Sequence, residues 1–435
     1  MALYRRELGN GIHYNHITTD RFKTAYLSVN FILPLEKESA AYYTLLPCVL
    51  QRGCKKYPEY KNLVRRFDEL YGTSITVGNT KRGEAEVVSF AINMLDNAYL
   101  PEGEDMDLLR EAVGLLLDII ADPVTENDLF LKKNVELERR NCIDARRAAI
   151  NNKQRYAYER CVALMFEGEK YGICADGEIE DYEKLDPSEL VRLYNEMLTS
   201  ACTEIFYVGK DSPETIEALL LENPMFLNRA DGNITFPKTV RDFDAKAVRR
   251  FEETTPAEQG KLVVGFRVGE QDSCALSLFN EIYGGAPSSK LFVNVREKLS
   301  LCYSCSSLAD AAKGALFVLA GIENENLDVS LTEIQKQLDN MRQSEITEEE
   351  ILCAKQSLMN GYRSLSDSAK ALETWYLRRI IAGKSEEPEE VLEKIAALTV
   401  EDVVRVANTV VCDTVYFLKG EKTIVYDEAD CEVEE

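Results

Sequence analysis

Histidine is scarce in this sequence: the 435 residues contain two, His13 and His16. They stand three apart in the run GIHYNHIT, which is typical of a strand, and positions three apart in a strand point to opposite faces. A hydrolytic zinc site needs three protein ligands and a general base. We therefore expect both histidines to be half-exposed strand residues, and the alternative of a weak His-x-x-His metal site is disfavoured.

Positive charge is also in short supply. The chain has 51 Lys and Arg against 75 Asp and Glu, so its formal net charge is −24. Nucleic acids and anionic membrane surfaces are bound by an excess of basic side chains, so neither is expected as a partner. A solvated acidic surface is the simpler interpretation of this charge, and an acidic cavity that attracts basic peptides is the more specific one.

Long apolar runs are missing. The longest is near Val113–Ile120, is interrupted by Asp118, and is far too short to span a bilayer. The first residues, MALYRRELGNG, lack the apolar stretch of a secretory signal, so we expect a cytoplasmic protein. The 12 cysteines are scattered, and we expect them to be reduced and mostly buried. Cys302 and Cys305 lie in a predicted strand on opposite faces, which argues against a redox or metal pair.

What the sequence does contain is an internal repeat. The segment EKLDPSELVRLYNEMLTSACTEIFYVGK begins at Glu183, and EKIAALTVEDVVRVANTVVCDTVYFLKG begins at Glu393. Each is a capped helix followed by a strand. The repeat predicts an α+β fold of two tandem homologous domains, each an antiparallel-rich sheet packed with helices. We place the domains at residues 1–215 and 256–435, with a connecting segment at 216–255.

Local patterns place the helices that matter for the site. Apolar spacing and capping predict helices over Ala40–Gln51 and Lys61–Tyr71, and a long helical region over Glu126–Phe166. In the second half, a helix over Ser288–Leu299 is followed by a strand that begins near Cys302.

The string YGGAPSSKLFVNVREKLSLCYSCSS, Tyr283–Ser307, resembles the pitrilysin/insulinase family of zinc peptidases, which includes the mitochondrial processing peptidase. The family's recurring residues stand here in register as Gly284, Gly285, Ser288, Ser289, Leu291, Phe292, Arg296, Glu297, Lys298 and Tyr303. Tandem α+β domains that form half of a clamshell are also typical of this family, so the resemblance extends over about residues 5–420.

The resemblance implies where a zinc site would lie. Peptidases of this family carry His-x-x-Glu-His on a helix of the first half, and these five positions fall here on Thr44, Leu45, Leu46, Pro47 and Cys48. The third ligand, seven residues after a Glu-Arg pair, falls on Ala145. Cys48 can offer a thiolate, but Thr44, Pro47 and Ala145 cannot complete a zinc site. We therefore expect no metal in this chain.

Arg296 and Tyr303 have a distinct implied role. In family members that work as pairs, one subunit keeps the zinc and the other keeps an Arg and a Tyr that reach the partner's active site. A guanidinium binds peptide carbonyls, and a Tyr hydroxyl stabilises an oxyanion. Gly284, Gly285 and Ser288 are expected to contact substrate, although a tight turn also explains the glycines. The simpler alternatives are a surface ion pair for Arg296 and a buried ring for Tyr303.

Two functional hypotheses follow. In the first, the chain is the zinc-less, substrate-binding subunit of a heterodimeric peptidase, its partner is a homologous zinc-bearing subunit, and its substrate is a peptide. In the second, it is a structural or peptide-binding homologue with no role in proteolysis. A third hypothesis, a self-sufficient peptidase, is disfavoured by the missing ligands, and a homodimer is the alternative assembly when the chain is isolated.

Overall fold

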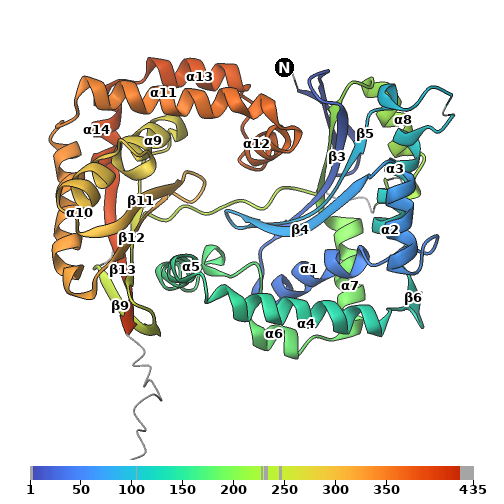
Figure 1. Ribbon diagram of the computed structural model, residues 1–435, viewed down its shortest axis with the longest axis horizontal. Coiled ribbons are helices and arrows are strands. Elements are labelled where there is room, and N and C mark those ends of the chain that lie inside the picture. Colours follow the sequence, from blue (N-terminus) through green and yellow to red (C-terminus); the bar gives the residue numbers. More distant parts are fainter. Residues whose placement is uncertain (1–2, 104, 227–228, 230–233, 244–246, 422–435) are drawn as a thin grey trace, which may run out of the picture. The chain divides into compact units, whose positions relative to one another are not determined.

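The computed structural model describes residues 3–421 except 104, 227–228, 230–233 and 244–246, and it divides into two compact α+β units (Figure 1). The first unit consists of residues 1–148, 168–240 and 360–392, and the second of residues 149–167, 241–359 and 393–435. Part of the predicted connecting segment 216–255 therefore lies outside the described residues. No described helix is long and apolar enough to cross a membrane.

The first unit is built on a six-stranded sheet with the order β1-β2-β8-β3-β5-β4. All neighbours are antiparallel except β2 and β8, which are parallel. The strands are β1 (Tyr4–Gly9), β2 (Ile12–Thr18), β3 (Thr24–Pro34), β4 (Ser74–Arg82), β5 (Ala85–Leu95) and β8 (Cys202–Gly209). Because β4 has a neighbour on one side only, it forms an edge of the sheet next to the helix that follows β3.

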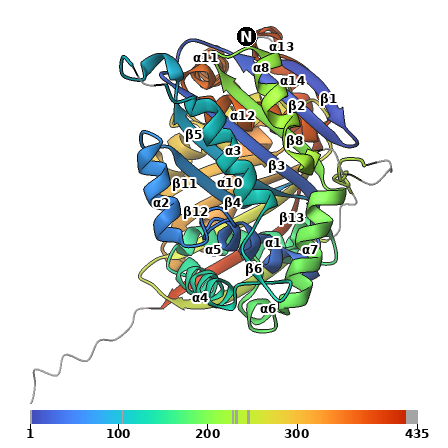
Figure 2. The same cartoon turned by 90° about the vertical axis from the view of Figure 1, so that its right-hand side faces the viewer.

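Helices cover one face of this sheet, with α3 and α7 lying across it (Figure 2). The helices are α1 (Lys37–Leu50), α2 (Tyr60–Glu69), α3 (Leu108–Ala121), α4 (Lys132–Ala149), α6 (Ile179–Glu183), α7 (Pro187–Ser200) and α8 (Pro213–Leu221). The helices predicted over Ala40–Gln51 and Lys61–Tyr71 are confirmed as α1 and α2, with small differences at their ends.

The region predicted to be helical over Glu126–Phe166 is not one continuous helix. It begins with a short hairpin of β6 (Thr125–Glu126) and β7 (Leu129–Phe130), continues as α4, and breaks before α5 (Lys153–Met165). The break has a local cause, because the Asn152 side chain caps α5 by accepting a hydrogen bond from the Arg155 backbone N–H at 3.0 Å.

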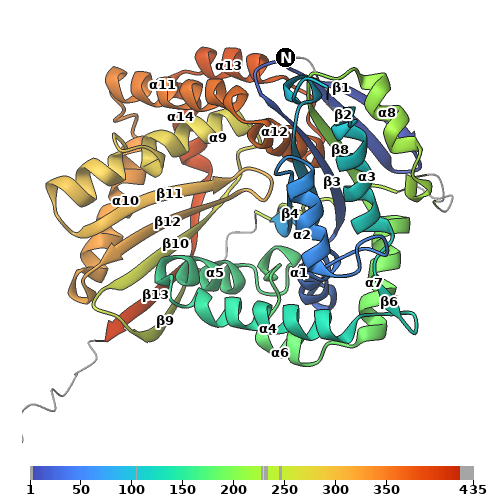
Figure 3. The same ribbon diagram turned by 45° about the vertical axis from the view of Figure 1, so that its right-hand side comes forward.

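The second unit repeats the topology of the first. Its sheet has the order β11-β12-β10-β13-β9, again with one parallel pair, β13 and β9, among antiparallel neighbours (Figure 3). The strands are β9 (Arg249–Pro256), β10 (Gly260–Val268), β11 (Cys302–Asp310), β12 (Ala315–Ile322) and β13 (Val410–Glu421). Reversed, this order matches β2-β8-β3-β5-β4, so the α+β fold of two homologous halves is confirmed.

The helices of the second half are α9 (Ser273–Asn280), α10 (Leu327–Arg342), α11 (Glu348–Ser364), α12 (Ala369–Ile381), α13 (Pro388–Ala397) and α14 (Val400–Thr409). The segment predicted as a helix over Ser288–Leu299 is a wider, π-helical stretch, Leu291–Lys298.

Each sheet is covered on its other face by one helix from the opposite half of the sequence. Helix α12 packs on β3 and β8 of the first unit, where Leu372 and Tyr376 join a cluster with Phe206 and Val208. Helix α5 packs on β10 and β13 of the second unit. Both sheets are therefore buried on two faces, which explains the apolar runs in their central strands.

A buried carboxyl group supports the contact between α1 and the sheet. Glu86 of β5 is 0% exposed, and its Oε1 accepts a hydrogen bond from Asn79 of β4 at 2.6 Å. Burial raises the pKa of Glu86 to about 8, and the nearby Asp176 adds to this rise, while the hydrogen bond from Asn79 opposes it. The folded protein therefore holds Glu86 protonated at neutral pH.

We predict that Glu86 makes the protein less stable as the pH rises. An unfolded glutamate ionises near pH 4.5 and the folded one near pH 8, so the folded state binds the extra proton between these values. Stability should fall across this interval by a few kcal/mol at most, at about 1.4 kcal/mol per pKa unit. Urea unfolding at pH 6 and pH 8.5 measures the change in the free energy of unfolding.

The variant Glu86→Gln should reduce this pH dependence. The exposed Glu126→Gln is the matched control, and equal pH dependence in both variants would contradict the prediction.

Candidate functional site

The helix expected to carry zinc ligands is α1, and its first ligand position is used structurally. The Thr44 hydroxyl donates to the Ala175 carbonyl at 2.9 Å and accepts from the Asn79 amide at 2.9 Å. The same Asn79 amide reaches Glu86. Thr44 thus ties α1 to β4 and to the segment before α6, and its oxygen atom is engaged within the unit.

The position of the general base is Pro47, which is buried inside α1. Its ring has neither a carboxylate nor a backbone N–H, so it can neither accept a proton from water nor continue the helical hydrogen bonds. The helix nevertheless continues to Leu50 because its apolar side chains, including Leu45, Leu46 and Val49, belong to the core of the first unit.

The two remaining ligand positions also lack a suitable set of donors. Cys48 is partly exposed and its thiol donates to the Thr44 carbonyl at 3.6 Å, and Ala145 of α4 is an exposed methyl group. Within the part of the chain that the structure describes, no group of three or more His, Cys, Asp or Glu side chains is placed to hold a metal ion. This region can bind or position other groups, but it offers no zinc-activated water.

The two histidines have separate partners. His13 Nδ1 lies 3.2 Å from Glu204 Oε1, whereas His16 contacts Tyr14 and stacks on Tyr207 with ring centroids 5.1 Å apart. The prediction that both are half-exposed is wrong for His16, which is 1% exposed because β2 lies inside the sheet beside β8. Burial lowers the pKa of His16.

Arg296 and Tyr303 come together in the second unit. Arg296 lies at the end of the π-helical stretch, and its Nε donates to the backbone carbonyl of Tyr303 at 3.1 Å. Its guanidinium lies 4.4 Å from the ring centroid of Phe292. No ion pair of Arg296 with a carboxylate is found among the described residues, so the surface ion pair considered above is not formed there.

The Tyr303 side chain is 61% exposed, so the alternative of a buried ring is wrong. Its hydroxyl donates to Glu323 Oε1 at 3.1 Å, and this bond is the main reason that the pKa of Tyr303 is raised. Tyr303 lies on β11, which pairs with β12 alone and forms an edge of the second sheet. An aromatic side chain thus stands in solvent beside unpaired strand backbone.

The Gly-Gly-x-x-Ser segment lies next to the same strand. A Cβ atom on Gly284 would lie 2.6 Å from Ser307 Oγ, so the absence of a side chain lets this turn pack against β11. Gly285 and Ser288 are exposed. Ser300 adopts a left-handed φ of 51° in the turn before β11.

The prediction that the two cysteines of the C-x-x-C pair lie on opposite faces of their strand is wrong. Cys302 and Cys305 are both buried, so their side chains lie on the same face of the strand. The cause is a shift of the β11–β12 register between Cys302 and Ser304, since an extra residue in a strand turns the following side chains over. The pKa of Cys302 is lowered, mainly by the hydrogen bond with Cys305 and also by the charge of Arg296.

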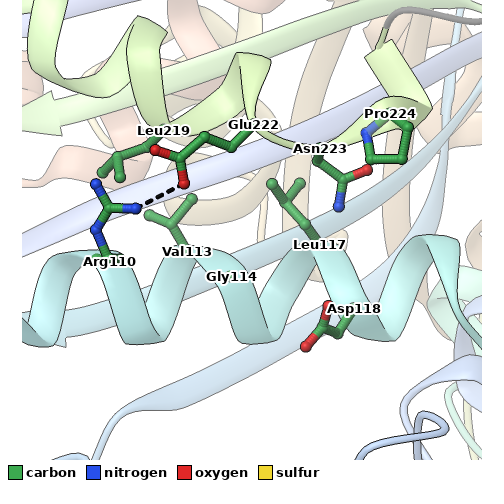
Figure 4. A pocket seen from close by; sticks show the side chains of 9 residues that line it. All are labelled: Arg110, Val113, Gly114, Leu117, Asp118, Leu219, Glu222, Asn223 and Pro224. Atoms are coloured by element: carbon green, nitrogen blue, oxygen red, sulfur yellow. Dashed lines mark hydrogen bonds and ion pairs between the residues drawn. The ribbon is translucent and has the colours of Figure 1, made fainter.

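A shallow hollow of about 320 Å³ lies in the first unit between α3 and the end of α8 (Figure 4). Val113, Leu117 and Leu219 form its apolar lining, and the Arg110–Glu222 ion pair of 2.6 Å lies on one side. Asp118 points away from α8 in Figure 4. With its charged pair already satisfied, the hollow has no reactive group.

The sequence patterns missed the partners of the α1 positions. Asn79 and Ala175 carry no motif of their own, and each meets Thr44 of α1 through the packing of segments that are distant in sequence. No local pattern pointed to either contact.

Comparisons with known proteins give the relationship. The family described as "Peptidase M16 inactive domain" matches residues 184–358. A relative from Bacillus subtilis, described as "Probable inactive metalloprotease YmfF", is 30% identical over 427 residues, or 94% of this chain and 96% of that protein.

Solved structures agree with this relationship. A conserved protein from Enterococcus faecalis has a TM-score of 0.88 at 29% identity, covering 97% of this chain and 100% of that one. A chain of complex III2 from Candida albicans, with a TM-score of 0.70 at 15% identity over 96% and 95% of the two chains, shares the fold alone.

The match to the Bacillus protein extends over nearly the full length of both chains, and the repeated topology and the Tyr283–Ser307 string agree with it. This chain belongs to the M16 family of peptidases, the pitrilysin/insulinase family.

Proposed function

We propose that this chain is the zinc-less, substrate-binding subunit of a heterodimeric peptidase whose zinc is held by a homologous partner. The observation that carries the proposal is the pairing of Arg296 with the backbone of Tyr303 at the exposed edge of the second sheet. The proposal requires that this chain is inactive by itself. The replaced ligand positions on α1 and α4 support this requirement, as does the description of the Bacillus relative as an inactive metalloprotease.

The chemistry assigned to the two side chains follows from their donors. The remaining guanidinium nitrogens of Arg296 would bind carbonyl oxygens of an extended peptide, because Arg keeps its charge at all relevant pH values. The Tyr303 hydroxyl would exchange its bond to Glu323 for one to the oxyanion formed in the partner's active site. The edge of β11 would accept the peptide as an added strand. When bound by the partner, zinc would supply the activated water.

The alternative is a peptide-binding or structural homologue with no part in proteolysis. The description of the Bacillus relative as inactive favours this alternative equally. The two differ in one consequence, since only the subunit hypothesis requires Arg296 and Tyr303 for turnover.

The variants Arg296→Ala and Tyr303→Phe test the subunit hypothesis. This chain alone should show no peptidase activity, and a mixture with a zinc-bearing homologue should be active. Loss of one donor to an oxyanion lowers kcat by about a hundredfold, so Tyr303→Phe should do so in the mixture. Lys298→Ala and Tyr99→Phe, both at exposed positions, are the matched controls. Full activity of both variants in a complex that still forms would favour the alternative function.

The isolated chain should contain far less than one zinc ion per molecule. The reason is that Thr44, Pro47 and Ala145 supply no ligand to accompany Cys48. Metal analysis of the purified chain, incubated with excess zinc and then desalted, measures this content. One retained zinc per chain would show that another set of ligands exists.

Cationic peptides should be cleaved faster than anionic peptides of the same length by the reconstituted pair. The physical reason is the net charge of −24, which attracts basic substrates and repels acidic ones. The difference should shrink as salt is added, because salt screens charges that are more than about 10 Å apart at 0.1 M. Equal rates at low salt would count against a basic substrate.

A further inference from the structure

A small niche lies over Gly321, where β12 runs between β10 and β11 in the second unit (Figure 3). Gly321 pairs with Lys261 of β10 on one side and with Ser304 of β11 on the other. Cross-strand partners point to the same face of a sheet, so both side chains flank a residue that has none. A Cβ atom on Gly321 would lie 3.1 Å from Lys261 Nζ and 3.3 Å from Ser304 Oγ. A glycine inside a strand is typical of a place where a ligand approaches the backbone closely.

The ammonium group of Lys261 is half-buried and has no carboxylate partner in the part of the chain that the structure describes. Its Nζ makes one long hydrogen bond there, 3.5 Å to Gln259 Oε1, and the neighbouring exposed Glu258 forms no ion pair with it. Burial lowers the pKa of Lys261, and no nearby carboxylate opposes this effect. A partly desolvated ammonium group is stabilised by any anion that reaches it.

Two other carboxylates at this end of the sheet are already engaged. Glu253 stands level with Lys261 but on the far side of β13, and it is paired with Arg160 at 2.7 Å. Glu323 accepts the hydrogen bond of the Tyr303 hydroxyl at 3.1 Å. In a chain with 75 acidic side chains, the ammonium over Gly321 is thus held without any of them.

Ser304 supplies a second donor and opens the niche to solvent. Its side chain is exposed, and its hydroxyl forms no hydrogen bond with the described residues. It directly follows Tyr303 on β11, the edge strand that the proposed function assigns to the peptide. Helix α5 covers the same face farther along β12, where Tyr158 packs on Phe317 with ring centroids 5.1 Å apart.

We propose that Lys261 and Ser304 bind a carboxylate group of a peptide over Gly321. The ammonium offers three rotatable N–H donors and the serine hydroxyl one O–H donor, which suit the two acceptor oxygen atoms of a carboxylate. A single cation in a chain of net charge −24 suits a monovalent anion better than a phosphate group. The proposal rests on that part of the proposed function in which β11 receives a peptide, and it does not require the zinc-bearing partner.

The carboxylate would fix where the peptide begins or ends along β11. Two sources have the same chemistry, namely the C-terminal carboxylate of the peptide and the side chain of an Asp or Glu within it. The rest of the peptide can still be basic, because the long-range attraction depends on the total charge of the chain, whereas the niche makes one local contact.

The test titrates the isolated full-length chain with three forms of one labelled decapeptide of Ala, Thr, Val and Lys, followed by fluorescence anisotropy. The first form has a free C-terminal carboxylate, the second a C-terminal amide, and the third the amide and one central Glu in place of Thr. The first or the third form should bind about tenfold tighter than the second, as expected for a hydrogen bond to a charged group. Which of the two binds tighter identifies the source of the carboxylate.

Two variants should remove this difference and leave binding of the amide unchanged. Lys261→Met removes the charge. Gly321→Ala fills the niche, and it should fold because the atoms that its Cβ would meet are the free ends of flexible side chains. The matched controls are Lys419→Met in the same sheet and Gly361→Ala, where a Cβ would meet no atom within 4 Å.

The outcomes separate this proposal from the proposed function. Equal binding of all three peptides, or a difference that survives in both variants, overturns the niche and leaves peptide binding at β11 intact. If none of the peptides binds, that part of the proposed function fails, and the niche is tested with sodium acetate against sodium chloride at equal ionic strength. In NMR spectra of the chain with ¹³C-methylated lysines, acetate should shift the signal that Lys261→Met removes more than any other lysine signal. No selective shift would overturn the niche as well.

Discussion

The burial of α1 is the constraint on which the rest of the first unit depends. This helix contributes a continuous apolar face to the core, and its few polar atoms bond to neighbouring segments. Thr44 is joined to Ala175 and Asn79, and the Cys48 thiol donates to the Thr44 carbonyl within the helix. A helix that in zinc peptidases would direct ligands at a metal is here used to hold β4 and the segment before α6.

This use of α1 has an electrostatic consequence. Metal ligands need charge and partial solvation, whereas the Asn79–Glu86 contact lies in a region where burial raises the pKa of a carboxyl group to about 8. A protonated carboxyl group suits a buried hydrogen-bond network. Around Glu86, the loss of the zinc ligands is therefore accompanied by an environment that disfavours a carboxylate charge.

At the edge strand β11 of the second unit, the notable side chains are accessible to solvent rather than buried. Arg296 is fixed by the carbonyl of Tyr303 and by the ring of Phe292, while the Tyr303 ring remains in solvent. An ordered arginine and an exposed aromatic ring at a strand edge are groups that bind peptides with little loss of side-chain entropy. The hydrogen bonds of α1 are thus buried, whereas Arg296 and Tyr303 near β11 are accessible to a ligand. The proposed function accounts for this difference, because this subunit would bind the peptide while its partner holds the zinc.

Much of this could be predicted from the sequence. The repeat of helix and strand at Glu183 and Glu393 predicted the two halves, and the Tyr283–Ser307 string predicted Arg296 on a helix and Tyr303 at the start of the next strand. The domain limits and the roles of these side chains stay predictions.

The structural features that the sequence patterns did not predict depend on single residues or on packing between distant segments. The Asn152 cap divides a helical region, and one extra residue before Cys305 reverses the face of Cys302. The exchange of α5 and α12 between the halves, and the contacts of Thr44 with Asn79 and Ala175, bring together segments that no local pattern relates.

The central claim is that this chain completes the active site of a zinc-bearing partner. The most direct measurement is a titration, in which a fixed amount of the zinc-bearing homologue receives increasing amounts of this chain while peptide cleavage is followed. The account predicts that activity rises in proportion to added chain and reaches a plateau at one equivalent. A flat response, with the homologue fully active or fully inactive throughout, would contradict it.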